Sequence, residues 1–154
     1  MKKENEKLIG IERYNFNKKN IIGKGGFGLV YKALDLNTNE NVAIKEIYFE
    51  DEEEKSLIIN EINLMKNIDS CYSIKLMDNF IDEKFYYIVM ELCDDNLNNY
   101  VKKNRGKINI ELIQKILIQL NDVLRFMKIK KINHRDIKPQ NIFLFFINLK
   151  TSFN

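Results

Sequence analysis

The residues best suited to chemistry gather in one short segment near the carboxyl end of the sequence. The chain contains one histidine and one proline, and both fall in the octapeptide that runs from His134 to Asn141. Because Pro139 cannot continue the helix expected before it, the octapeptide is predicted to be a loop. This loop presents a base at Asp136, a cation at Lys138 and an amide oxygen at Asn141. We interpret it as a reactive site rather than an ordinary polar loop.

A second candidate site is a glycine-rich segment far upstream, Gly23-Lys24-Gly25-Gly26-Phe27-Gly28. A dinucleotide-binding fold needs a helix after such glycines and an acidic residue about 20 positions on, but residues 29–34 continue as a strand. A phosphate-binding loop of the Walker type needs a lysine directly after the last glycine, where this chain has Leu29. The remaining interpretation is a flap between two strands. Without side chains, its glycines can bring backbone N–H groups against phosphate oxygens.

A third candidate is the strand Val42-Ala43-Ile44-Lys45, in which alternation puts Ala43 and Lys45 on one face. Taken alone, Lys45 would be a surface lysine on an edge strand. Glu61, however, shares a predicted helical stripe with Leu57, Leu64 and Met65, so its carboxylate is expected to face the core, where an unpaired charge is costly. Lys45 is the predicted partner of Glu61.

Elements of two kinds must position these residues. The alternating patterns predict strands from Tyr14 to about Ile22 and over residues 28–35, 41–49, 74–80 and 85–92, with one amphipathic helix over 51–68. After residue 92 the pattern changes to helix, over residues 97–103 and about 110–128. The expected fold class is therefore α+β, with a strand-rich first part and a helical second part.

Composition sets the background for these motifs. The 154 residues are 45% hydrophobic and 31% charged, which indicates a folded chain, and the net charge of +3 is spread along it. We therefore expect no nucleic-acid partner. The longest apolar run is far shorter than the roughly 18 residues that a membrane helix needs, so no membrane association is expected either. Cys71 and Cys93 make neither a disulfide framework nor a zinc set, and both are expected to be reduced thiols in a cytoplasmic or nuclear protein.

The flap, the Val-Ala-Ile-Lys strand and the His-Arg-Asp loop, in this order, resemble the eukaryotic protein kinases. The resemblance covers Tyr14 to about Leu144. It implies a kinase-like fold with a five-stranded antiparallel N-lobe and one αC-type helix over about residues 14–92. Residues 93–154 would hold the first helices and the catalytic loop of an incomplete C-lobe, and residues 1–13 would be an N-terminal extension.

The resemblance also implies a nucleotide site in the first lobe. In such kinases the flap covers the phosphates of ATP, which assigns this role to Gly23, Lys24, Gly25, Gly26, Phe27 and Gly28. Lys45 would hold the α- and β-phosphates while paired to Glu61, and Val30 with Ala43 would sandwich the adenine. Met90-Glu91-Leu92-Cys93 is similar to the kinase hinge. There the Glu91 carbonyl and the Cys93 amide would bond the adenine edge, Met90 would guard the back pocket, and Asp95 or Asn96 would reach the ribose.

The same resemblance assigns the catalytic loop. Asp136 would accept the proton of the substrate hydroxyl, Lys138 would neutralise charge on the γ-phosphate, and the Asn141 oxygen would bind Mg²⁺. A lysine two residues after the catalytic aspartate is the serine/threonine pattern, so the implied reaction transfers phosphate from ATP to a protein serine or threonine. His134 is expected to pack beneath the site, and Arg135 to anchor a phosphorylated activation loop.

One part of the kinase pattern is missing from the sequence. Kinases continue with Asp-Phe-Gly, whose aspartate holds the principal magnesium ion, yet no aspartate follows Asp136 in this chain. We therefore expect a truncated kinase domain with little or no turnover. The alternative is a non-catalytic, pseudokinase-like fragment that binds nucleotide or a complete kinase.

Apolar surface is a further expectation. The helix over about 110–128 has a core stripe of eight residues, namely Leu112, Ile113, Ile116, Leu117, Leu120, Val123, Leu124 and Met127. Ile110, Ile118 and Phe126 widen this stripe beyond one face, and residues 142–147 form an uncharged apolar run. The chain is expected to self-associate through this surface. Alternatively, the run forms the short strand pair that follows the catalytic loop in kinases, with Asn148 at its turn.

Overall fold

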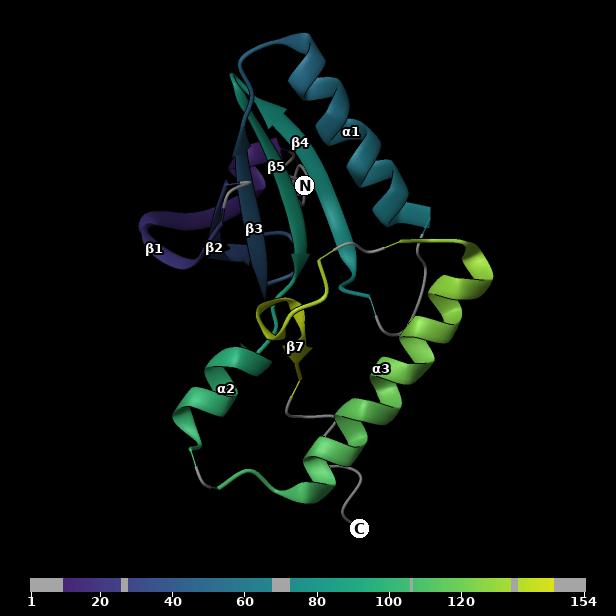
Figure 1. Ribbon diagram of the computed structural model, residues 1–154. Coiled ribbons are helices and arrows are strands. Elements are labelled where there is room, and N and C mark those ends of the chain that lie inside the picture. Colours follow the sequence, from purple (N-terminus) through teal and green to yellow (C-terminus); the bar gives the residue numbers. More distant parts are fainter. Residues whose placement is uncertain (1–9, 26–27, 68–72, 106, 134–135, 146–154) are drawn as a thin grey trace, which may run out of the picture. The chain divides into compact units, whose positions relative to one another are not determined.

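The computed structural model describes residues 10–25, 28–67, 73–105, 107–133 and 136–145 (Figure 1). The chain divides into two compact units, Met1–Leu92 and Cys93–Asn154, called here the N-terminal and C-terminal units. Among the described residues, no helix has the length and apolarity that crossing a membrane requires.

The N-terminal unit is built on a five-stranded antiparallel sheet in the order β1-β2-β3-β5-β4. A 3-10 helix, η1 (Gly10–Arg13), leads into the sheet, and α1 (Glu52–Asn67) connects β3 to β4. The strands are β1 (Tyr14–Gly25), β2 (Gly28–Asp35), β3 (Glu40–Tyr48), β4 (Leu76–Asp82) and β5 (Phe85–Glu91). The predicted sheet and its single helix are confirmed, with β1 extending three residues further than expected because its end pairs with Gly28.

Tight turns set the register of the sheet. The β2–β3 turn closes with the Asn39 N–H donating to the Asp35 carbonyl at 2.7 Å, and Asn39 adopts the left-handed conformation (φ 61°) that asparagine tolerates better than most residues. The β4–β5 turn has Glu83 in the same region of φ (53°). These two polar connections lie between strands that the sequence predicted.

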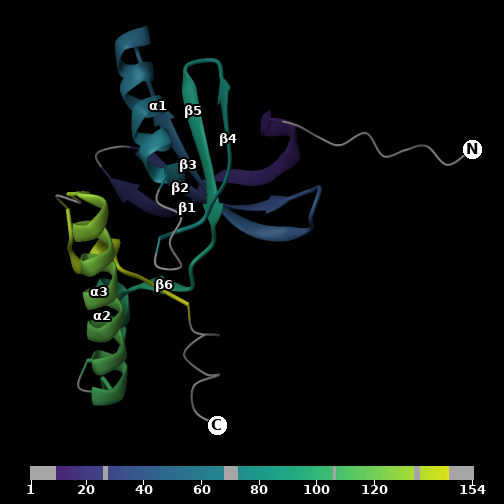
Figure 2. The same ribbon diagram turned by 90° about the vertical axis from the view of Figure 1, so that its right-hand side faces the viewer.

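The sheet buries a different core on each face. On one face, six buried side chains form an aromatic and aliphatic cluster: Tyr14, Ala33, Val42, Ile44, Tyr87 and Val89. On the other face, α1 covers a second cluster made by Ile47, Phe49, Tyr86 and Ile88. Figure 2 shows α1 beside the sheet. Successive residues of β3 and β5 alternate between the two clusters, as the pleat requires.

The inward face of α1 differs from the sequence prediction. Ile62 is the buried contact at 1% exposure, with Ile58 and Ile59 partly buried beside it. Leu57 is 65% exposed, and Glu61 is exposed as well. The expectation that Glu61 faces the core is therefore wrong. The Ile58/Ile62 pair is turned by about 100° from the Leu57/Glu61 pair, and it is the isoleucine pair that the second cluster of the sheet accepts.

The C-terminal unit contains β6 (Asp95–Asn96), α2 (Leu97–Lys103), α3 (Ile110–Lys130), η2 (Pro139–Asn141) and β7 (Phe143–Leu144). Asparagines begin both α-helices, because the Asn96 side chain accepts from the Asn99 N–H and the Asn109 side chain from the Glu111 N–H. α3 ends where Lys131 turns left-handed at φ 55°. Both helices were predicted, and α3 continues two residues past its expected end.

Two features of this unit depart from the sequence expectation. β7 pairs with β6, with Asp95 opposite Leu144 and Asn96 opposite Phe143, and the turn expected at Asn148 lies outside the described residues. Of the eight residues predicted as the core stripe of α3, Ile116 and Met127 are buried, whereas Ile113, Leu117 and Leu124 are exposed. Three of the eight stripe residues of α3 therefore lie at the surface of the chain, and two are buried.

Candidate functional site

Cross-strand pairing brings the predicted nucleotide residues of the sheet together. Gly23 stands opposite Val30, Val30 opposite Lys45, and Lys45 opposite Ile88, so these residues form one row across four strands. Two positions away, Ala43 stands opposite Met90. Because Ile88 packs under α1, alternation places Val30, Ala43, Lys45 and Met90 on that same face of the sheet.

Lys45 is held in a partly desolvated position. Burial lowers the pKa of its ammonium group, and the negative charge of Glu61 opposes this shift. Glu61 thus acts on Lys45 through its charge, although its side chain is exposed rather than turned into the core. A half-buried cation of this kind gains from a nearby anion, because water no longer solvates it fully. The phosphate of a nucleotide is such an anion.

The flap glycines differ in what their backbone requires. Gly28 has φ +125°, and a Cβ at this position would lie 2.1 Å from the Glu46 carbonyl oxygen. Gly25 is open, with nothing within 4 Å of a Cβ, and Gly23 would meet Val30 at 3.4 Å. β3 therefore excludes a side chain at Gly28, whereas space beside the backbone at Gly25 is free for a ligand.

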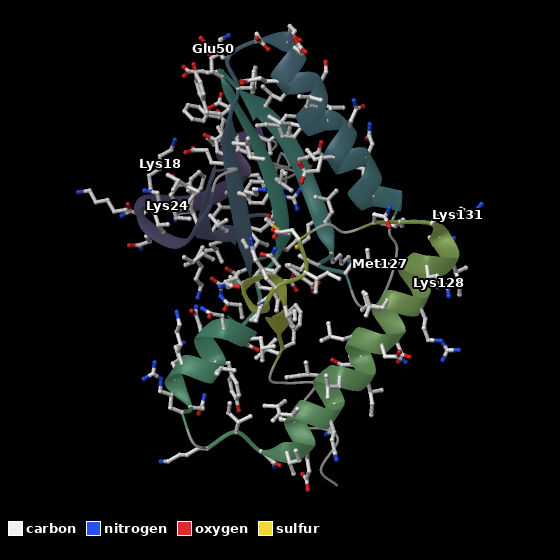
Figure 3. All side chains as sticks on the ribbon, viewed as in Figure 1. Lys18, Lys24, Glu50, Met127, Lys128 and Lys131 are labelled. Carbon is white, nitrogen blue, oxygen red and sulfur yellow. The ribbon has the colours of Figure 1, made fainter. Side chains whose placement is uncertain are left out.

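Lys24 pairs with Leu29, one position out of phase with the row that contains Lys45. Its exposed side chain projects from β1 (Figure 3) and by alternation belongs to the other face of the sheet. A contact between Lys24 and a nucleotide would therefore come from its backbone. Gly26 and Phe27, also assigned to the flap, lie outside the described residues.

The hinge-like segment spans the boundary between the two units. The Glu91 N–H donates to the Lys75 carbonyl at 3.1 Å, and the Glu91 carboxylate accepts from the Lys75 N–H at 2.7 Å, which fixes the end of β5. Cys93, the first residue of the C-terminal unit, is a half-buried cysteine. Cys71 lies outside the described residues.

The two side chains considered for the ribose have structural partners. The Asp95 carboxylate accepts from Lys103 Nζ at 2.6 Å, and the Asn96 side chain caps α2. Burial would raise the pKa of Asp95, but the Lys103 hydrogen bond and the Asn96 amide outweigh it, so the net pKa shift is downward. Both side chains thus stabilise the start and end of α2.

The residues of the predicted catalytic loop converge on one carboxylate. Lys138 Nζ lies 2.9 Å from Asp136 Oδ2, and Asn141 Nδ2 donates to the same oxygen at 2.8 Å and to the Asp136 carbonyl at 2.9 Å. The single turn of η2 makes this possible, because the Asn141 N–H donates to the Lys138 carbonyl at 2.9 Å and Pro139 begins the turn. His134 and Arg135 lie outside the described residues. A base, a cation and an amide N–H therefore meet at an exposed site.

Comparison with known proteins agrees with this geometry. The family model described as protein kinase domain matches residues 16–150. The chain belongs to the protein kinase domain family. A curated relative of this family, cyclin-dependent kinase-like 1 from Caenorhabditis elegans, is 36% identical over 126 residues, which cover 80% of this chain and 35% of the relative. The chain thus spans about a third of the length of that kinase-like relative.

Sequence reasoning missed a buried carboxylate next to Lys45 in the chain. Glu46 faces away from α1 and is 7% exposed. It accepts from Lys18 Nζ at 2.6 Å, Tyr87 Oη at 2.8 Å and Tyr31 Oη at 3.1 Å. Through these bonds Glu46 ties β1, β2 and β5 to β3, the strand that carries Lys45. An acidic residue at an inward strand position was the available signal, because such a carboxylate needs partners.

Proposed function

We propose that this chain binds ATP together with Mg²⁺ on a fold built to transfer the γ-phosphate to a serine or threonine hydroxyl of a protein. We further propose that these 154 residues alone complete that transfer at a negligible rate. Residues 14–154 would form the kinase domain, divided near residue 92. The observation that supports the proposal is the convergence of Lys138 and Asn141 on the Asp136 carboxylate.

This geometry suits the proton acceptor of a phosphoryl transfer. The Lys138 ammonium and the Asn141 amide both bond the Asp136 carboxylate, and a carboxylate can accept a hydroxyl proton. The two bonds from Asn141 also fix the direction of the carboxylate. Lys138 would then stabilise the negative charge of the phosphoryl group as it moves.

The loop also fits a magnesium ion. Because Asn141 Nδ2 bonds Asp136, the amide oxygen is turned elsewhere, and oxygen atoms are the ligands that Mg²⁺ prefers. Among the described residues no three histidine, cysteine or acidic side chains form a metal-binding group, so the phosphates of ATP would supply further oxygens. When bound, Mg²⁺ would neutralise charge on those phosphates. Asn141 is the residue of this chain that would hold it.

Missing charge stabilisation explains the expected lack of turnover. Phosphoryl transfer depends almost wholly on positioned cations, and the sequence holds no aspartate after Asp136 that could serve as a second magnesium ligand. Each 1.4 kcal/mol added to the barrier slows a reaction about tenfold. Nucleotide binding requires less, because Val30 and Lys45 stand opposite each other and Ala43 shares their face of the sheet.

Isothermal titration of the 154-residue chain with ATP and Mg²⁺ tests the binding proposal. We expect weak binding that Lys45→Gln reduces at least about tenfold, since a charge-assisted bond to phosphate contributes about 1.5–3 kcal/mol. Lys19→Gln, which removes an exposed lysine of β1, is the matched control and should leave the affinity unchanged. Undetectable binding by the unsubstituted chain, or equal losses in both variants, would contradict the proposal.

Radiolabelled ATP with casein tests the reaction. We expect no label above the level of an Asp136→Asn control. If label is incorporated, phosphoamino-acid analysis decides its class: magnesium-dependent phosphoserine would refute the lack of turnover, and phosphotyrosine would refute the serine/threonine assignment. Because ATP is an intracellular metabolite, the proposal also places the chain in the cytoplasm or nucleus.

A non-catalytic interaction module is the second candidate, and the exposed apolar side chains of α3 favour it. Such a module would bind a complete kinase and change its activity. Adding the chain to an active kinase should then inhibit or activate it in proportion to the amount added. An unchanged rate at a large excess of the chain would exclude this role for that kinase.

A further inference from the structure

The exposed apolar residues of α3 follow a regular spacing. Ile113, Leu117, Leu120 and Leu124, called here the α3 seam, recur at intervals of four, three and four residues. Ile113, Leu117 and Leu124 are 38%, 60% and 49% exposed, and Leu120 is half-buried. Alternating steps of three and four are the heptad spacing with which one helix packs along another. The seam is thus shaped for a helical partner.

A groove adjoins the seam at the end of α3. Leu124, Met127, Ile132 and Ile137 form its apolar part, and Lys128, Lys131 and Asn133 complete its lining. Its volume is about 650 Å³. Figure 3 shows Met127 and Lys128 near the end of α3 and Lys131 just past it. The groove offers an apolar floor beside two positive charges, so a complementary partner presents an apolar side chain next to a carboxylate.

The start of α3 itself has these properties. Ile110 is 64% exposed, and the adjacent Glu111 is exposed and acidic. If two copies of α3 run antiparallel with Leu117 opposite Leu120 of the second copy, Ile113 meets Leu124 and Ile110 meets Met127 at the groove. Glu111 then approaches the lysines of the groove. A parallel pair would instead place the basic last turns of both helices together, where like charges repel.

We propose that the chain forms a symmetric homodimer in which the α3 seam packs antiparallel against the α3 seam of a second copy. The first turn of each helix fills the groove at the end of the other. Each helix contributes about two heptads, which is less than a standard protein interface. The dimer is therefore expected to be weak, with a dissociation constant on the order of micromolar to tens of micromolar.

Sedimentation equilibrium of the 154-residue chain between about 1 and 200 µM tests the dimer. Leu117→Glu should weaken it at least about tenfold, because it buries a charge in the seam. Ile118→Glu is the matched control, because Ile118 is 62% exposed, against 60% for Leu117, but lies outside the seam, about 100° around the helix from Leu117. The dissociation constant of this variant should stay within about threefold of the wild-type value. Circular dichroism should show the same helix content in both variants.

Two outcomes would overturn the dimer. One is a wild-type chain that stays monomeric throughout the concentration range. If the amides of α3 are then protected from hydrogen exchange, another segment of the chain covers the seam, and the dimer is refuted as well. The other is an equal response to Leu117→Glu and Ile118→Glu, which would indicate unspecific apolar association.

Spin labelling tests the orientation. Ile129 is 78% exposed and lies on the side of α3 away from the seam. The spin label is attached there through Ile129→Cys, on a Cys71→Ser/Cys93→Ser background. In the antiparallel dimer the two labels are separated by about 30 Å along the helix axis, given the rise of about 1.5 Å per residue. A parallel dimer would place them within about 25 Å, across two helices about 10 Å apart, and such a short distance would refute the proposed register.

Discussion

The neighbouring strand β3 requires a glycine at position 28, whether or not a ligand lies under the flap. Its φ of +125° and the 2.1 Å approach of a Cβ to the Glu46 carbonyl leave no room for a side chain. Gly25, on the opposite side of the same hairpin, has open space instead. One flap therefore contains a glycine needed for folding and a glycine that is free to serve binding.

Substituting each glycine by alanine separates these two roles. Gly28→Ala should lower the free energy of unfolding by roughly 2–3 kcal/mol or more, because it forces strain or a shift of β3. Gly25→Ala should change stability by less than about 1 kcal/mol while it weakens ATP binding, because its methyl group would occupy the space over the phosphates. Urea unfolding and calorimetric titration measure the two effects, and a Gly28→Ala chain as stable as Gly25→Ala would contradict this distinction.

Acid should lower the free energy of unfolding of the chain by protonating Asp35. This carboxylate is 1% exposed and accepts from Arg13 at 2.6 and 2.9 Å, and this hydrogen bonding lowers its pKa to about 2 from an ordinary 3.8. The unfolded chain therefore takes up the proton first as pH falls. The stabilisation is complete above about pH 4 and is lost as pH falls toward 2, by about 2 kcal/mol in total.

The comparison that isolates this effect uses Arg13→Gln. The difference in unfolding free energy between wild type and variant should be about 2 kcal/mol at pH 6 and should shrink toward zero near pH 2. Urea titrations at half-unit pH steps provide the measurement. A difference that stays constant with pH would mean that Arg13 stabilises the fold by packing, without acting on Asp35.

At the scale of elements, Ile62 is the most buried of the described side chains of α1. Ile62 is 1% exposed among Ile47, Phe49, Tyr86 and Ile88. Ile62→Ala should cost about 2–4 kcal/mol through lost burial and the cavity left behind. Leu57→Ala, at a position that is 65% exposed, should cost less than about 0.5 kcal/mol. Equal costs in denaturant unfolding would show that α1 packs on the face that the sequence pattern suggested.

The α1 example shows where sequence reasoning stops. Strands with period-two patterns and the loop around Asp136 could be predicted, because their signals are local. α1 has apolar residues on two overlapping stripes, and only the shape of the sheet beneath it selects Ile62 over Leu57. The β6–β7 pair was missed for a related reason: it joins two-residue strands nearly fifty positions apart, such as Asp95 with Leu144, without any local signature.

The site shows the same division between local and distant information. Asp136, Lys138 and Asn141 could be assigned together because a single turn of η2 connects them. The relation between Lys45 and Glu61 depends on how α1 is rotated. The two residues could be named from the sequence, but the carboxylate of Glu61 was wrongly expected to face the core. Glu46 was missed because its partners, such as Lys18 and Tyr87, come from other strands.

At the scale of the whole molecule, the buried core is divided unevenly between the two units. Among the described residues, all but three of the buried apolar side chains belong to the N-terminal unit, the exceptions being Ile116, Met127 and Leu144. Burial of apolar surface is the main source of folding stability. The two units are therefore expected to differ in stability and to open separately, so that the chain does not unfold in a single two-state transition.

Native-state hydrogen exchange should resolve this difference. Amides of β3 and β5 are expected to exchange slowly, through opening of the whole N-terminal unit, whereas those of α2 and α3 should exchange at least about a hundredfold faster in dilute solution. Raising the concentration should slow exchange in α3 and leave α2 unchanged, because dimerisation through the α3 seam adds stability by mass action. Leu117→Glu should abolish this concentration dependence and Ile118→Glu should retain it. Equal protection of α3 and β5 at low micromolar concentration would show instead that the two units unfold as one cooperative body.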